Sequence, residues 1–127
     1  MITSEKLIED LKQFYGTEKY WSLGFPTGIY LTDGAKYFAE QAEAFWLMNN
    51  LAMEYRKLEK LDNYIFVTVE NKEIIDKNGH EKRIATTIFT DGNDTTYSTR
   101  HYENLDLPLG VWKFYVMDNI ILLPSEY

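Results

Sequence analysis

The chain has 127 residues and a formal net charge of −7 at pH 7, and 45% of its residues are hydrophobic and 16% aromatic. It contains no cysteine, which excludes a disulfide framework, a thiolate zinc site and a thiol nucleophile. The excess of carboxylates disfavours direct binding to nucleic acid or to an anionic membrane, because both depend on Lys and Arg side chains. The acidity permits docking on a basic protein surface, although solubility is its simpler explanation.

The length predicts one domain over residues 1–127, with enough apolar side chains for a packed core. The N-terminal residues show no basic segment followed by a long apolar run, so we expect no signal peptide. No apolar run approaches the roughly 20 residues that a membrane-spanning helix needs. Together with the absence of cysteine, these patterns favour the cytoplasm.

Two helices are expected in the first half of the chain. The first begins with Thr3 or Ser4 as its N-cap and ends at Gly16-Thr17, and its apolar stripe consists of Leu7, Ile8, Leu11, Phe14 and Tyr15. Residues 17–31 are expected to form a loop with a short edge strand at 29–31.

The second helix is expected to start at Thr32 or Asp33 and to run to about Lys57. At a period of 3.6 residues its polar side chains fall on one narrow stripe, formed by Lys36, Glu40, Glu43, Asn50, Glu54 and Lys57. The rest of its circumference is apolar, which predicts a long helix that is largely buried.

From residue 63 onward the period changes to two, which is typical of β-strands. Strands are expected at 64–69, 83–90, 95–102, 111–117 and 120–123, with turns at 76–79, 91–94 and 118–119. The order of elements predicts an α+β fold, with two N-terminal helices packed on a four- to five-stranded antiparallel sheet.

Several short motifs carry a family resemblance. They are Thr32-Asp33-Gly34, Lys36-Tyr37, Ala39-Glu40, Trp46-Leu47, Thr90-Asp91-Gly92-Asn93, Leu107-Pro108-Leu109 and the C-terminal Leu122-Leu123-Pro124-Ser125-Glu126-Tyr127. From about Tyr30 onward, the chain resembles a family of small uncharacterised proteins found on bacterial chromosomes, plasmids and phages. Residues 72–82 and 103–106 depart from the family's pattern. The resemblance implies a protein of the bacterial host cytoplasm, often encoded on mobile DNA, and it transfers no catalytic residue.

Carboxylates occur with metal-ligand spacing at two places. Glu40 and Glu43 are three positions apart on the expected helix, but Lys36 lies within reach of Glu40, so a salt-bridged surface is the simpler interpretation. Residues 91–94 resemble the opening of a calcium loop, yet Glu103 stands out of register for the bidentate ligand. We therefore predict a turn at 91–94, and no metal or cofactor.

Neither histidine belongs to a catalytic motif. His80 adjoins a hairpin turn and is expected to be solvated, whereas His101 lies on a strand, where it is either a base paired with a carboxylate or a surface residue. The sequence shows no nucleophile elbow, Walker loop or dinucleotide fingerprint. We therefore do not predict an enzyme.

Aromatic residues gather in the least regular segment of the chain, namely Tyr15, Tyr20, Trp21, Phe25 and Tyr30. Tyr and Trp on loops are typical anchors of protein interfaces, and the alternative is a lid that covers the end of the second helix. We predict a partner-binding site formed by Tyr20, Trp21, Tyr30, Glu40 and Glu43.

The favoured hypothesis is a small acidic protein-binding module without catalysis, whose partner is a basic protein such as a nucleic-acid-handling effector. For a protein borne by a phage or mobile element, the specific hypothesis is an anti-CRISPR inhibitor of an RNA-guided nuclease. A second hypothesis is a ligand-binding or enzymatic domain, with a pocket between the second helix and the sheet that uses Asn49, Trp46 and His101. Asn49 alternatively satisfies a nearby backbone group. A third hypothesis is a self-associating structural protein, with a homodimer formed by a strand edge or by residues 20–30.

Overall fold

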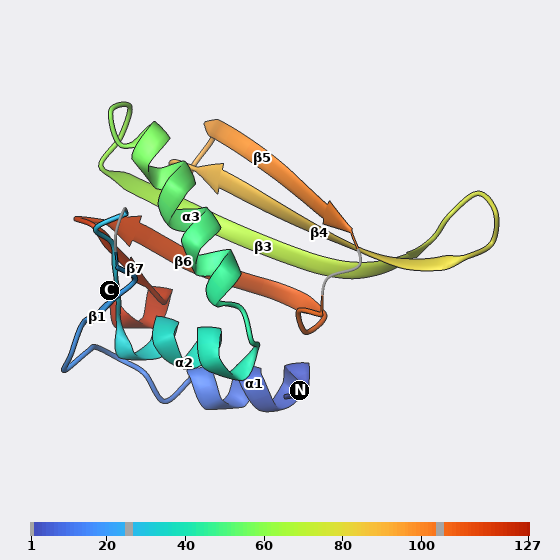
Figure 1. Cartoon of the computed structure of the whole chain (residues 1–127), viewed down its shortest axis with the longest axis horizontal. Coiled ribbons are helices and arrows are strands. Elements are labelled where there is room, and N and C mark those ends of the chain that lie inside the picture. Colours follow the sequence, from blue (N-terminus) through green and yellow to red (C-terminus); the bar gives the residue numbers. More distant parts are fainter. Residues whose placement is uncertain (1, 25–26, 104–105) are drawn as a thin grey trace.

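The computed structural model of the chain describes residues 2–24, 27–103 and 106–127 (Figure 1). Its elements in chain order are α1 (Ser4–Leu11), β1 (Trp21–Ser22), β2 (Tyr30–Leu31), α2 (Asp33–Gln41), α3 (Phe45–Leu58), β3 (Tyr64–Ile75), β4 (Glu81–Thr90), β5 (Thr96–Glu103), β6 (Gly110–Met117), β7 (Ile120–Leu122) and the 3-10 turn η1 (Pro124–Glu126). Three α-helices and seven strands within these residues confirm the α+β class. None of the described helices is both long and apolar enough to cross a membrane.

The strands of the described chain form one mixed sheet in the order β1-β2-β7-β6-β3-β4-β5. Neighbouring strands are antiparallel except β2 and β7, which run parallel with Tyr30 opposite Ile120. The prediction of four or five antiparallel strands is therefore wrong in the number of strands and in the direction of one pair. The strands expected at 29–31 and 120–123 are present as β2 and β7. The two-residue strand β1 shows no alternation, and a parallel pair that joins distant parts of the chain leaves no local signal.

The predicted second helix is wrong as a single element, because it consists of two helices that meet at residues 42–44. Glu43 has a φ of 52°. The Ala44 N–H donates to the Ala39 carbonyl at 2.8 Å, and the Glu43 N–H donates to the Glu40 carbonyl at 3.3 Å. These are the two bonds of a Schellman helix end, in which glycine usually takes the left-handed position. Since glutamate takes that position here, the sequence gives no sign of the break.

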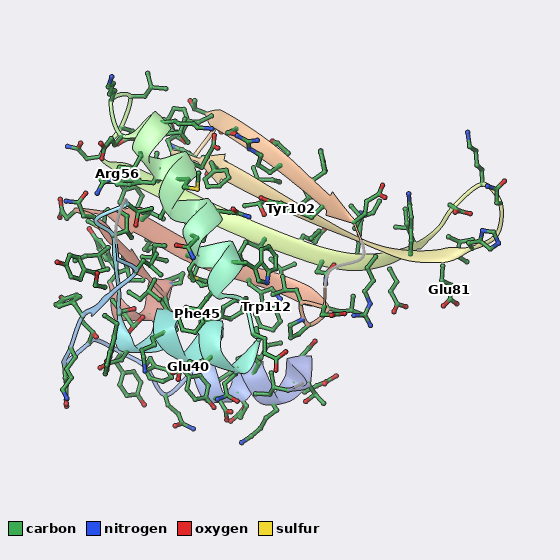
Figure 2. All side chains as sticks on the ribbon, in the orientation of Figure 1. Glu40, Phe45, Arg56, Glu81, Tyr102 and Trp112 are labelled. Atoms are coloured by element: carbon green, nitrogen blue, oxygen red, sulfur yellow. The ribbon has the colours of Figure 1, made fainter. Side chains whose placement is uncertain are left out.

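The break resets the helical phase, so the predicted polar stripe does not continue along α3. Glu54, expected to face water, is 8% exposed and accepts a hydrogen bond from Arg100 Nη2 at 2.7 Å. Phe45 and Trp46, expected to be buried, are 43% and 36% exposed, and Figure 2 shows Phe45 at the start of α3. Glu43 lies in the connector and no longer shares a helix face with α2.

Replacing Glu43 by glycine is expected to raise the free energy of unfolding by about 0.5–1 kcal/mol, because glycine adopts a positive φ without a steric cost. The matched control is Glu40→Gly inside α2, which is expected to lower that free energy by about 0.5–1 kcal/mol. Urea denaturation of both variants measures the two effects. A loss of stability in both would contradict a left-handed residue at position 43.

The α-helices lie on one side of the sheet, and we call the face that they cover the inner face. Along β3, Ile65 and Val67 point to this face and are fully buried, and they alternate with half-buried side chains of the outer face. The Phe38 ring of α2 packs on Trp112 and Phe114 of β6, at centroid distances of 5.5 and 5.0 Å. Since α3 crosses the strands on the same side, one hydrophobic core joins helices and sheet (Figure 1).

The C-terminal turn η1 makes hydrogen bonds with the N-terminal end of α2. The Thr32 hydroxyl accepts a hydrogen bond from the Ala35 N–H at 3.2 Å, as an N-cap does. The Glu126 carboxylate accepts from the Thr32 hydroxyl at 2.6 Å, from the Gly34 N–H at 3.0 Å and from the Leu123 N–H at 3.0 Å. We call this group, formed by Thr32, Gly34, Leu123 and Glu126, the terminal clamp. It brings the first and last of the family motifs into contact.

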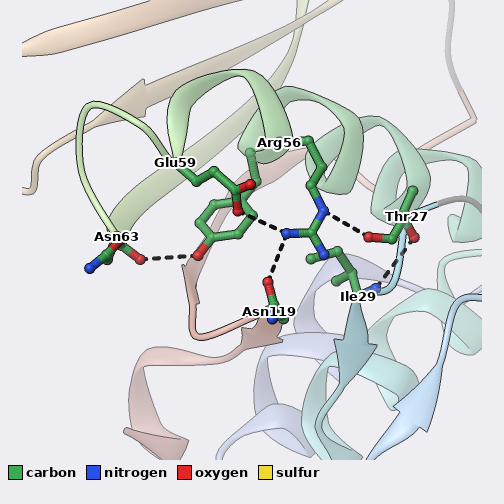
Figure 3. A network of polar contacts seen from close by, with 7 residues as sticks. Thr27, Ile29, Arg56, Glu59, Asn63 and Asn119 are labelled. Atoms are coloured by element: carbon green, nitrogen blue, oxygen red, sulfur yellow. Dashed lines mark hydrogen bonds and ion pairs between the residues drawn. The ribbon is translucent and has the colours of Figure 1, made fainter.

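Near the C-terminal end of α3, Arg56 binds to two other segments of the chain (Figure 3). The Nε–H of Arg56 donates to the Thr27 carbonyl at 2.8 Å. Its Nη1 group donates to the Glu59 carboxylate and to Asn119 Oδ1, both at 2.8 Å. One guanidinium therefore connects α3 with the segment before β2 and with the hairpin turn between β6 and β7.

Candidate protein-docking site

The five predicted partner-binding residues do not form one site. Tyr20 and Tyr30 lie on the outer side of the sheet. Trp21 instead lies beside the first turn of α2, and Glu40 belongs to the last turn of that helix. Glu43 lies in the connector between α2 and α3. The fold therefore divides the prediction between two faces of the molecule.

Trp21 anchors the segment that follows α1 onto helix α2. Its Nε1–H donates to Asp33 Oδ1 at 3.0 Å, and Lys36 Nζ lies 4.0 Å from the centre of its ring. Lys36 also pairs with Glu40 at 3.2 Å, which is the salt-bridged surface that the spacing suggested. The Glu18 N–H donates to the second carboxylate oxygen of Asp33 at 3.0 Å. These contacts give Trp21 the role of a lid at a helix end. Phe25, from the same predicted cluster, lies outside the described residues.

The Trp21 indole bond, followed by the Glu18 N–H, lowers the pKa of Asp33. A carboxyl group whose pKa is lower in the folded state stabilises the fold above its unfolded pKa of about 3.9, and this stabilisation is lost as the pH falls through the folded pKa. Asp33→Asn is therefore expected to be less stable than the wild type at pH 7, by a difference that shrinks below about pH 4. Thermal unfolding between pH 7 and pH 2 measures this difference. A stability difference that is independent of pH would contradict a lowered pKa at Asp33. Because Trp21→Phe removes the indole N–H, this variant is expected to lose part of the pH dependence.

The outer face of the sheet carries an aromatic patch, which we define as Tyr64, Phe66, Tyr115 and Tyr127. The Tyr115 ring lies at its centre, with centroid distances of 5.1 Å to Tyr64, 5.2 Å to Phe66 and 5.7 Å to Tyr127. Three of the rings are half-buried, and Tyr127 is 75% exposed. The α-helices lie on the opposite face, so these rings line the open side of the sheet (Figure 1).

The Tyr64 hydroxyl group of the patch is neutral at physiological pH. Burial, followed by the neighbouring Tyr115 hydroxyl, raises the pKa of Tyr64 above its ordinary value. The patch therefore combines apolar ring surface with phenolic O–H groups, of which that of Tyr64 is held protonated. This combination is typical of tyrosines at protein interfaces.

Carboxylates lie in two turns at the end of the sheet that carries the aromatic patch. Asp91 and Asp94 lie in the turn between β4 and β5, and Asp118 lies in the turn between β6 and β7. The first turn touches the patch, because a Cβ on Gly92 would lie 3.8 Å from the Cβ of Phe66.

A hollow of about 190 Å³ borders the patch at the β7 side. Its lining includes Tyr20, Met117, Ile120 and Tyr127. Tyr30 is next to it, because it lies opposite Ile120 in the parallel pair and is 45% exposed. Two of the predicted partner-binding residues, Tyr20 and Tyr30, are thus continuous with the aromatic patch.

Sequence reasoning missed the patch itself, although a signal for it is present. Residues 64–67 and 114–117 are aromatic or aliphatic at odd and even positions alike. A strand that packs on helices with one face and meets water with the other is expected to alternate. The missing alternation indicates that both faces of β3 and β6 are apolar at this end of the sheet.

The pocket of the ligand-binding hypothesis is small. A hollow of about 160 Å³ lies between α3 and the strands β4 and β5, lined in part by Asn50 and Tyr102. The lining includes neither Asn49 nor His101, and pockets for small molecules usually measure about 300–1,000 Å³. Trp46 packs edge-on against Tyr102 at 6.0 Å. The Asn49 side chain donates to the backbone carbonyl four residues earlier at 3.2 Å, as the alternative interpretation predicted.

The remaining candidate groups have ordinary surface environments. His80 and His101 are exposed, and His101 Nδ1 lies 3.2 Å from the Thr86 hydroxyl. Asp91 Oδ1 accepts from the Asn93 N–H at 2.8 Å, which makes 91–94 a turn. In the described part of the chain, no three His, Asp or Glu side chains are placed to hold a metal ion.

Comparison with known protein families matches residues 5–127 to a family of unknown function, DUF6876. The chain belongs to this family. The DUF6876 match includes all the helices and strands described from α2 to η1, and it confirms the expected membership of an uncharacterised family. Searches among curated proteins and among solved structures found no match. The function of this DUF6876 chain therefore has to be argued from its own surface.

Proposed function

We propose that the protein is a non-enzymatic docking module whose aromatic patch binds a basic surface of another protein. The observation that carries the proposal is the group of four aromatic rings on the open face of the sheet. Aromatic side chains of this kind supply much of the binding energy at protein interfaces, since each buries a large area and loses little rotamer freedom. Strands β3 and β6 carry three of the rings, those of Tyr64, Phe66 and Tyr115, so binding these rings requires little further ordering.

The charge around the patch determines the chemistry of the proposed partner. Asp91, Asp94 and Asp118 lie in two turns at the end of the sheet that carries the patch, and the whole chain has a net charge of −7. A basic partner is attracted over long distances by the net negative charge, and it meets the apolar patch beside the carboxylates of the two turns. An acidic partner is repelled by the same charges.

A nucleic-acid-handling protein is one class of partner with the required basic surface, because its channels hold phosphate groups. Inhibition of an RNA-guided nuclease, the specific hypothesis from the sequence, belongs to this class. Its support consists of the negative charge, the small size and the aromatic patch.

Site-specific photo-crosslinking in bacterial cells tests the proposal. A photoreactive phenylalanine is placed at position 66 or 68 on the outer face, and at position 53 or 57 on the exposed side of α3. The proposal predicts one discrete adduct with a basic protein from the outer-face positions, which is absent from the α3 positions. Adducts from α3 alone would contradict it.

Two matched tyrosine variants complete the experiment. Tyr127 belongs to the patch and is 75% exposed, whereas Tyr15 follows α1 and is 80% exposed. Tyr127→Ala is expected to reduce the adduct about tenfold or more, the range of an interface hot spot, and Tyr15→Ala is expected to leave it unchanged. An adduct of two copies of the chain would instead identify a homodimer and overturn the assignment of a separate partner.

A further inference from the structure

The free edge of strand β6 forms a second surface, distinct from the aromatic patch. Strand β7 pairs with β6 only from Tyr115 to Met117. Residues 110–114 continue the ladder with β3 on one side, and no described strand pairs with them on the other. About half of β6 is therefore an edge strand, although β6 lies inside the sheet at its other end.

The hairpin between β6 and β7 determines which backbone groups point to this edge. Its two turn residues, Asp118 and Asn119, have φ values of 51° and 64°, and Met117 lies opposite Ile120. In such a hairpin the closing pair is hydrogen-bonded, and the direction of the backbone groups then alternates along the strand. The N–H and C=O groups of residues 111 and 113 consequently point away from β3, toward the free edge.

An apolar groove of about 450 Å³ runs beside these groups. We call it the edge groove, and its lining includes Ile8 and Leu11 of α1, Val111 and Phe114 of β6, and Leu123 before η1. Ile8 and Val111 are each 47% exposed. Open strand groups beside an apolar groove are the two features that β-strand addition requires, because the backbone provides affinity and the groove accepts alternate side chains.

The charge of the edge groove differs from that of the rest of the molecule. Lys12 and Lys113 belong to its lining, in a chain whose net charge is −7, and Lys12 also forms an exposed ion pair with Glu9 at 3.4 Å. Lysine on an edge strand discourages unspecific pairing between sheets. It also favours a strand that carries a carboxylate, because such a strand brings an opposite charge to each lysine.

We propose that the edge groove binds an extended apolar segment of another protein, flanked by carboxylates, which adds to the sheet as a strand beside residues 110–114 of β6. Five residues of an added strand span roughly 16 Å. Alternate apolar side chains of the segment lie against α1 and Leu123, and its acidic residues meet Lys12 and Lys113. The segment occupies a different surface from the basic partner proposed above.

Synthetic peptides test this proposal with the full-length protein. The probes are three capped, fluorescent heptapeptides with Glu at both ends, Thr at two inner positions and Val, Leu or Phe at the other three. Anisotropy titration is expected to show saturable binding of at least one of them. Two changes to that peptide, Lys in place of both Glu residues and N-methylation of the backbone, are each expected to weaken binding tenfold or more.

Two variants of β6 locate the binding. Val111→Pro removes an edge N–H, which edge strands tolerate, and is expected to weaken binding at least tenfold. Lys113→Glu keeps the backbone and is expected to weaken binding about fivefold or more, by like-charge repulsion. Circular dichroism confirms that each variant is folded. Tyr127→Ala, which disturbs only the aromatic patch, is expected to bind the peptide as the wild type does, so the two proposals fail independently.

Three results would overturn the proposal. They are no binding by any of the three acidic peptides, equal binding by the Lys-flanked peptide, and binding that neither Val111→Pro nor Lys113→Glu weakens. Light scattering of the protein alone provides a fourth such result. A concentration-dependent dimer that Val111→Pro abolishes would identify a second copy of the chain as the occupant of the edge groove.

Discussion

Replacing Glu126 by alanine is expected to lower the free energy of unfolding by about 2–4 kcal/mol, because its carboxylate accepts three hydrogen bonds in the terminal clamp. The Gly34 N–H is one of the first N–H groups of α2, which have no partner within the helix. A negative charge at this end is also favoured by the helix dipole. Urea denaturation followed by circular dichroism measures the loss. Glu40→Ala, on the exposed side of the same helix, is the control, and we expect it to change the stability by less than about 0.5 kcal/mol.

The glycine of the clamp provides a second, independent test of the same contact. A Cβ at Gly34 would lie 2.5 Å from Leu123 Cδ1 and 2.6 Å from Glu126 Oε1, so Gly34→Ala has to displace both side chains. We expect it to cost about 1–3 kcal/mol, although alanine is the better helix former by about 1 kcal/mol. In the Glu126→Ala background the cost should fall by at least about 1 kcal/mol, because one of the displaced groups is already missing. Additive losses would show that the two residues do not touch.

Replacing Phe38 by alanine is expected to lower the free energy of unfolding by about 3–5 kcal/mol. Phe38 is fully buried, and it is the side chain through which α2 packs on Trp112 and Phe114. The truncation removes apolar contacts and leaves a cavity between helix and sheet, and interiors collapse into such cavities only in part. Phe38→Leu, which fills most of the space, is expected to cost roughly 1–2 kcal/mol. Calorimetry or urea denaturation gives both values.

The Phe38 experiment also tests the two-helix arrangement. If α2 and α3 formed one straight helix, position 38 would share its face with position 45, whose side chain is 43% exposed. Phe45→Ala is therefore the matched control, and we expect it to cost less than about 1 kcal/mol. Equal costs at the two positions would contradict the break at Glu43.

The fold class could be predicted because the long elements have clear periods. Strands β3, β4 and β6 carry alternating or β-branched runs. Each of the N-caps, Thr3 and Thr32, is one of the two residues expected at that helix start. The break after α2 could not be predicted, since glutamate occupies the left-handed position that glycine normally marks. The β2–β7 pair depends on contacts between distant segments, and it therefore left no local pattern.

The residues that border the aromatic patch were predicted only in part, because the sequence of one strand does not show which face of the sheet the helices leave open. Tyr20 and Tyr30 were recognised as aromatic residues in an irregular segment, and they do border the aromatic patch. Three rings of the patch, those of Tyr64, Phe66 and Tyr115, lie on strands whose sequence pattern did not single them out. A pattern in one strand shows how many faces are apolar, but the positions of the helices determine which face remains open.

The measurement that tests the central claim most directly is NMR mapping of the surface that the partner, once identified by crosslinking, covers on the isotopically labelled protein. Amide and aromatic NMR signals are compared between the free protein and the complex. The proposed function predicts that the changes concentrate on β3, β6, Tyr127 and the 91–94 turn, with the exposed side of α3 unchanged. Changes confined to the α-helices, with the aromatic patch unaffected, would contradict it.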